Sequence, residues 1–77
     1  MGNPNRRYVL FTKKDFWELW ECHGNKVTFV NDAWMHNTKF KLTHKKSMIC
    51  DIRIRLGFSK TYMNEDQAEI YLFMEGL

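Results

Sequence analysis

The sequence has no apolar run of about 18 residues, so it predicts no membrane-spanning segment. Its opening, MGNPNRRYVLF, has no apolar stretch followed by a small-residue cleavage site, so it predicts no secretory signal. The two cysteines, Cys22 and Cys50, are too few for a disulfide scaffold. We therefore expect a cytoplasmic protein that does not associate with a membrane and whose cysteines remain thiols.

Motifs for catalysis and metal binding are also missing. The sequence has no glycine-rich phosphate loop, no nucleophile elbow and no paired metal-binding carboxylates. The spacing of the candidate zinc ligands fits no standard pairing; these are Cys22, His23, His36, His44 and Cys50. A histidine with Arg53 and Arg55 is a residue set that a small ribonuclease could use, but no motif supports it. We expect a protein that is not an enzyme and needs no cofactor or metal.

Aromatic residues, in contrast, are abundant for so short a chain. Of 77 residues 16% are aromatic, and a domain of this size has little interior in which to bury them. We expect a flexible N-terminus over residues 1–5, followed by one domain over residues 6–77. The rings that the core cannot hold would suit a protein interface. The candidates are Trp17, Trp20, Trp34 and Tyr71.

Charge is distributed unevenly along the chain. Residues 37–60 contain seven basic residues and one acidic residue, whereas residues 61–77 contain four acidic residues and no basic one. The formal net charge is +3. An asymmetry of this kind bears on binding partners rather than on the fold.

Two segments have the signals of helices. Thr12 is a suitable N-cap and Gly24 a suitable stop for a helix over residues 13–23, whose apolar residues recur at helical spacing. A second helix is predicted to start at Asn64, with Gln67 at the third helical position and acidic residues in the first turn. Ile70, Phe73, Met74 and Leu77 give this helix an apolar stripe. The stretch IYLFM within it also fits a buried strand.

Strands are predicted where β-branched, aromatic or alternating residues occur. These segments are RRYVLF (6–11), KVTFVNDAWMH (26–36), KFKLTH (39–44) and MICDIRIRLGF (48–58). The sequence therefore predicts a small α+β domain with a three- to four-stranded antiparallel sheet and two helices, in the order β-α-β-β-β-α.

The last two predicted strands would form a hairpin with a basic face. Alternation places Lys39, Lys41, Arg53 and Arg55 on one face, and Lys45 and Lys46 in the connecting loop. Together with Lys60, these residues form a candidate surface for nucleic-acid phosphates.

A protein partner is the alternative. Apolar helix surfaces would anchor the contact, and the basic hairpin would steer the protein to an acidic partner. An accessory or inhibitor protein of the kind that phages and plasmids encode fits this description, and so does a subunit of a larger complex. The sequence leaves homodimerisation open.

Overall fold

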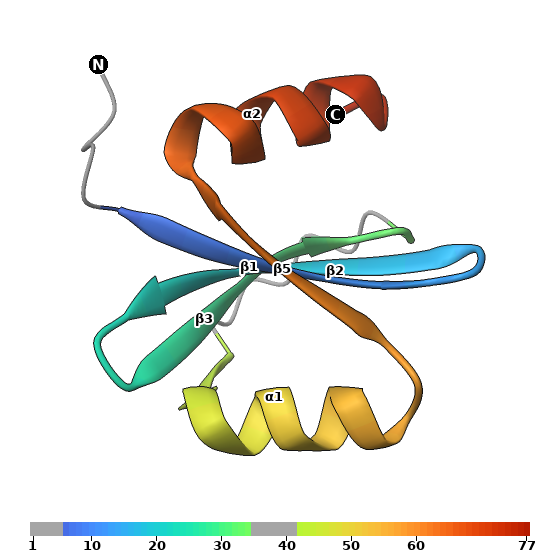
Figure 1. The fold of residues 1–77 in the computed structure, drawn as a ribbon. Coiled ribbons are helices and arrows are strands. Elements are labelled where there is room, and N and C mark those ends of the chain that lie inside the picture. Colours follow the sequence, from blue (N-terminus) through green and yellow to red (C-terminus); the bar gives the residue numbers. More distant parts are fainter. Residues whose placement is uncertain (1–5, 35–41) are drawn as a thin grey trace.

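The computed structural model describes residues 6–34 and 42–77, which form one antiparallel sheet and two helices (Figure 1). In chain order the elements are β1 (Arg7–Lys13), β2 (Phe16–His23), β3 (Lys26–Asp32), β4 (Thr43–Lys45), α1 (Lys46–Arg55), β5 (Ser59–Asn64) and α2 (Glu65–Met74). The segment 1–5, expected to be flexible, lies outside the described residues, as do Lys39 and Lys41.

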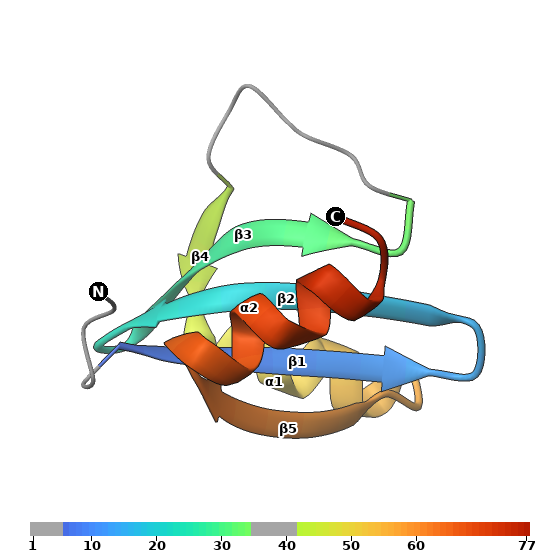
Figure 2. The ribbon, with the colours of Figure 1, turned by 90° about the horizontal axis from the view of Figure 1, so that it is seen from above.

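Each face of the sheet carries one helix. The strand order is β4-β3-β2-β1-β5, and every neighbouring pair is antiparallel. α1 crosses one face from the β4 edge to the β5 edge, and α2 lies on the opposite face (Figures 1 and 2). The predicted class, an α+β domain with an antiparallel sheet and two helices, is confirmed, although the sheet has five strands. The predicted order is wrong, because the elements follow as β-β-β-β-α-β-α.

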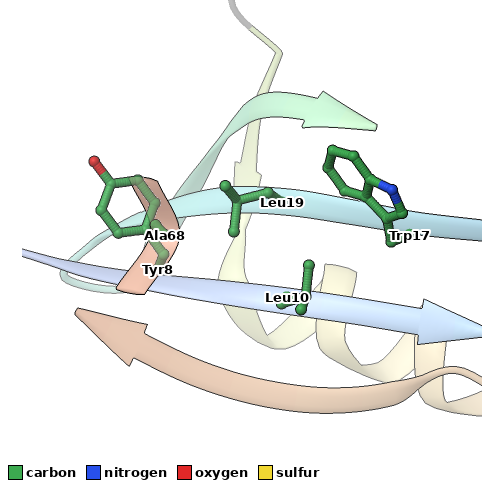
Figure 3. Packing of buried hydrophobic residues seen from close by; sticks show 5 residues of the cluster. All are labelled: Tyr8, Leu10, Trp17, Leu19 and Ala68. Carbon is green, nitrogen blue, oxygen red and sulfur yellow. The ribbon is translucent and has the colours of Figure 1, made fainter. Parts of the chain in front are cut away.

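The core under α2 is built by β1, β2 and one small helix residue. Tyr8 and Leu10 come from β1, Trp17 and Leu19 come from β2, and Ala68 comes from α2 (Figure 3). Ala68 is only 2% exposed, so α2 buries a methyl group where a helix ordinarily buries larger side chains. Such a small contact residue lets the helix lie close to the sheet.

A second core lies under α1. It contains Val9, Phe11, Trp20, Val27 and Ile49, of which Ile49 is the buried residue of the helix. Because the two cores use alternate residues of the same strand, β1 is buried on both faces over residues 8–11. Burial on both faces removes the alternation of apolar and polar residues that usually identifies a strand.

The same effect explains why the helix predicted over residues 13–23 is wrong. This segment contains β2, which pairs with β1 across a turn at Lys14 and Asp15. Its apolar residues serve both cores, with Trp17 and Leu19 on one face and Trp20 on the other, so the spacing imitates a helix. Gly24, expected to end a helix, instead forms the β2–β3 turn with φ 59°.

The strand predicted over residues 48–58 is also wrong, because most of it is α1. Its inner face follows helical spacing and consists of Lys46, Ile49, Cys50 and Arg53. Two of these four residues are cations, so the sequence does not present them as an apolar face. The alternating Ile52, Ile54 and Leu56 point outward and are 39–54% exposed.

Both helices end in the same hydrogen-bonded motif. After α1, Phe58 N–H donates to Arg53 O at 3.0 Å, and Gly57 N–H donates to Ile54 O at 3.0 Å. Gly57 has φ 93°, a conformation that favours glycine. β5 starts two residues later and was not predicted.

The second predicted helix is confirmed as α2. The Asn64 side chain accepts a hydrogen bond from Gln67 N–H at 2.8 Å, and the Gln67 side chain accepts one from Asn64 N–H at 3.0 Å. Glu65 and Asp66 occupy the first turn, where the positive end of the helix dipole favours acidic residues. The alternative reading of IYLFM as a strand is therefore wrong.

Candidate functional site

The outer face of α2 is apolar and open to solvent. Ile70, Phe73 and Met74 are 59%, 79% and 77% exposed, and Leu77, just beyond the helix, is 43% exposed. The spacing of Ile70, Phe73 and Met74 places them on one side of the helix, and Leu77 follows the turn at Gly76. We call these four residues the α2 stripe.

Acidic residues continue this face toward the start of the helix. Asp66 and Glu69 are exposed, while Glu65 is half-buried and its Oε1 accepts a hydrogen bond from Arg6 Nη1 at 3.2 Å. The outer side of α2 is therefore acidic in its first half and apolar in its second half.

Contacts on the inner side hold α2 in this orientation. Trp17 Nε1–H donates to Glu75 Oε1 at 2.9 Å, and the Trp17 ring meets the Tyr71 ring edge-on at 5.2 Å. Burial, with a smaller contribution from Glu75, raises the pKa of the Tyr71 hydroxyl. Because Ala68, Tyr71 and Leu72 pack inward, the α2 stripe cannot turn into the core without breaking these contacts.

A pocket of about 360 Å³ opens on the other face of the sheet, beside α1. It is lined by Glu18, Trp20, Phe29, Asp32, Trp34, Leu42, His44, Ile49 and Arg53. Trp20, which is 3% exposed, meets Phe29 edge-on at 5.4 Å and lies 6.1 Å from the His44 ring. Trp34 and Leu42 are 71% and 45% exposed, so the pocket has a buried aromatic wall and exposed apolar residues.

One ion pair, between Glu18 and Arg53, lies in the lining of this pocket. Glu18 Oε1 accepts hydrogen bonds from Arg53 Nε at 2.6 Å and from Trp20 Nε1 at 3.1 Å. The Glu18 and Arg53 side chains are only 13% and 19% exposed. Asp32 adds a second carboxylate, whose Oδ1 accepts the Trp34 backbone N–H at 2.9 Å.

The candidate basic residues do not form a hairpin face. Arg53 and Arg55 lie on α1, and Arg53 points inward to Glu18 although the alternating pattern had placed it outward. Arg55 is exposed and pairs with Asp51 on the same helix at 3.2 Å. Lys45 is the last residue of β4, where it lies opposite Lys26. The hairpin hypothesis is therefore wrong for the residues that the structure describes.

Two of the predicted lysines do come together, around a tyrosine. Lys46 Nζ lies 4.8 Å and Lys60 Nζ 5.3 Å from the centre of the Tyr62 ring. Tyr62 is 41% exposed on the edge strand β5. Ammonium groups at such distances interact favourably with the ring electrons. Lys46 and Lys60 are far apart in the sequence, so only the fold reveals this cluster.

The aromatic candidates divide into buried and exposed residues. Trp17 and Trp20 are 6% and 3% exposed and belong to the two cores, so their assignment to an interface is wrong. Tyr71 is half-buried against Trp17. Trp34 alone among the four is largely exposed. The sequence pattern identified the residues of the α2 stripe but not the side that they face.

The described ranges also bear on metal and membrane binding. They contain no group of three or more His, Cys, Asp or Glu side chains placed to hold a metal ion. Neither helix has the length and apolar character that crossing a membrane requires.

Burial raises the pKa of the Cys22 thiol, which lowers the fraction of reactive thiolate.

Comparison of the chain with protein-family models, with curated proteins and with solved structures found no match.

Proposed function

We propose that this chain is a small, non-enzymatic protein-binding module that docks through the outer face of α2. The observation that carries the proposal is the exposure of the α2 stripe, led by Phe73 at 79% and Met74 at 77%. A contiguous apolar surface of this kind on a small protein marks an interaction site. Apolar and aromatic residues that become fully desolvated supply most of the binding energy of such contacts.

The acidic residues beside the α2 stripe indicate which charges the partner's surface should carry. Asp66 and Glu69 flank the α2 stripe, so the complementary surface is an apolar groove with basic residues at the end that receives the start of α2. Recognition would follow the helix-in-groove mode, in which side chains three and four residues apart enter one groove. An accessory or inhibitor protein acting in the cytoplasm belongs to the same proposal.

Site-specific cross-linking tests this proposal. A photoreactive amino acid replaces Phe73 in one variant and, in a control, Ile54, an apolar residue of α1 that is 51% exposed. We expect a cross-linked heterologous protein at position 73 in the native cell, and loss of that product when Met74→Asp is added. The fold should persist, because both side chains face solvent.

Three results would contradict the proposal. Equal cross-linking at positions 54 and 73 would indicate non-specific adhesion, and no product at position 73 would leave the α2 stripe without a partner. A cross-link to a second copy would make the stripe a homodimer interface instead.

Nucleic-acid binding is the second candidate, and the cluster of Lys46, Lys60 and Tyr62 favours it. Lysines beside an exposed ring combine phosphate contact with a stacking surface. The signature of this function is an affinity that falls steeply as salt rises, because phosphate contacts release counterions.

A further inference from the structure

The pocket beside α1 has the size and composition of a small-molecule site. Its volume of about 360 Å³ lies at the lower end of the range of roughly 300–1,000 Å³ for ligand pockets, so it suits one ring system rather than a long ligand. Three aromatic side chains, Trp20, Phe29 and Trp34, are among the residues that line it. Flat rings stack favourably on such side chains.

The polar groups of the pocket offer donors and an acceptor side by side. Among the described residues, Arg53 uses only Nε, so its terminal nitrogens Nη1 and Nη2 donate to none of them. Glu18 Oε1 accepts two hydrogen bonds, whereas Oε2 accepts none from the described residues. The hydrogen bond from Arg53 Nε to Glu18 Oε1 holds the two side chains together. The terminal nitrogens of Arg53 and Oε2 of Glu18 therefore lie on neighbouring groups.

Charge then selects the class of ligand. The charges of Glu18 and Arg53 cancel, and Asp32 adds a carboxylate to the lining. A phosphate or carboxylate would meet two carboxylates, and a quaternary ammonium group would offer no acceptor to the terminal nitrogens of Arg53. A neutral flat ring that carries both donors and acceptors meets neither penalty.

We propose that this pocket binds a single nucleobase, stacked on the aromatic wall and hydrogen-bonded to Glu18 and Arg53. All nucleobases carry a donor and an acceptor next to each other on one edge, and proteins read unpaired bases by stacking and by hydrogen bonds to that edge. The base has two sources, a free nucleoside or an unpaired position of a single strand. The site lies across the sheet from α2, so it is independent of the proposed protein-binding surface.

The test titrates the protein with adenosine, guanosine, cytidine and uridine, and separately with single-stranded ten-nucleotide DNA and RNA. Benzoate and choline serve as anionic and cationic controls of comparable size. Binding is followed by tryptophan fluorescence and located by backbone amide chemical shifts. We expect saturable binding that shifts amides around Trp20, Phe29 and His44, with the charged controls binding at least about tenfold more weakly than the best nucleoside.

Variants connect the binding to the pocket. Trp34→Ala should weaken binding by roughly 5- to 100-fold, as loss of a stacking side chain does, and Trp34→Phe should restore most of it. Arg53→Lys, which keeps the charge beside Glu18 but removes the forked donors, should weaken binding several-fold. Phe73→Ala on α2 is the matched control and should leave the affinity unchanged.

Each outcome decides the proposal. Binding of oligonucleotides alone, with the same dependence on Trp34, supports it and identifies single strands as the source. Binding of nucleosides with that dependence supports it and identifies the free ligand. No binding of either probe overturns it, as does binding unchanged by both Trp34→Ala and Arg53→Lys, or binding of benzoate or choline as strong as that of nucleosides.

Discussion

The two helices lie on opposite faces of one sheet and are held there by different kinds of contact. α2 has its own capping box, packs Ala68 against the sheet and accepts hydrogen bonds from Trp17 at Glu75 and from Arg6 at Glu65. α1 has no side-chain N-cap, and cations mediate its polar contacts with other elements. Arg53 pairs with Glu18, and Lys13 Nζ donates to Leu56 O at 2.7 Å at the end of the helix.

The two candidate sites lie on opposite faces of the sheet, one beside each helix. The α2 face uses its apolar residues on both sides of the helix, and those on the outer side remain exposed. The α1 face encloses polar groups, and an aromatic pocket forms around them. In this protein the capped helix has an apolar surface open to solvent, whereas the helix without a side-chain cap borders the pocket.

The largest expected effect is the loss of one core tryptophan on either face. Trp17→Ala and Trp20→Ala should each destabilise the protein by about 3–5 kcal/mol, as truncation of a large buried ring does. Total stability is expected at roughly 4–12 kcal/mol for a chain of this length, so each variant comes close to unfolding. Urea unfolding measures the loss, and hydrogen exchange should show α2 loosened first by Trp17→Ala and α1 first by Trp20→Ala. The same exchange pattern in both variants would contradict the independence of the two faces.

A smaller effect separates the buried ion pair from an exposed one. Arg53→Met leaves the Glu18 carboxylate, 13% exposed, without its cation and should lower stability by about 1–3 kcal/mol. Arg6 is 42% exposed and bridges Glu21 and Glu65, where solvent screens its charge, so Arg6→Met should lower stability by clearly less than Arg53→Met. Chemical denaturation of the two variants at low and high salt makes the comparison. Equal losses would show that burial does not distinguish the two arginines.

The smallest expected effects concern the helix starts. Asn64→Ala removes the side-chain cap of α2 and should lower stability by about 1 kcal/mol. Lys45→Asp supplies the cap that α1 lacks and removes a like-charge pair with Lys26, so it should raise stability by roughly 0.5–1.5 kcal/mol. Thermal unfolding at matched concentration measures both. A destabilised Lys45→Asp variant would mean that Lys45 contributes more to β4 than to α1.

The helix that could be predicted is the one with local signals. Asn64 and Gln67 lie within one turn of each other, and their pairing marks the start of α2 in the sequence. The start of α1 has no such signal, and its inner face includes Lys46 and Arg53, whose burial depends on Tyr62 and Glu18 far along the chain. The end of α1 does have local signals, since Arg53 and Arg55 lie in its last turn and Gly57 follows, where a φ of 93° favours glycine.

As with the helices, the sequence could predict the candidate site that depends on local spacing but not the one that depends on distant residues. The spacing of Ile70, Phe73 and Met74 identified an apolar stripe, but its orientation depends on Trp17 and Tyr71 occupying the inner side. The pocket brings together residues from four elements and from both sides of positions 35–41. No spacing in the sequence encodes such a set.

The position of β1 has a consequence for synthesis of the chain. β1 is made before the other described strands, yet it lies between β2 and β5, and its partner on one side consists of residues 59–64. While the ribosome adds those residues, β1, β2 and β3 can already pair as successive hairpins, because their turns are short. Val9 and Phe11 then lie in an edge strand with open hydrogen-bonding groups. During this interval the nascent sheet is most open to a chaperone, or to a strand from another chain.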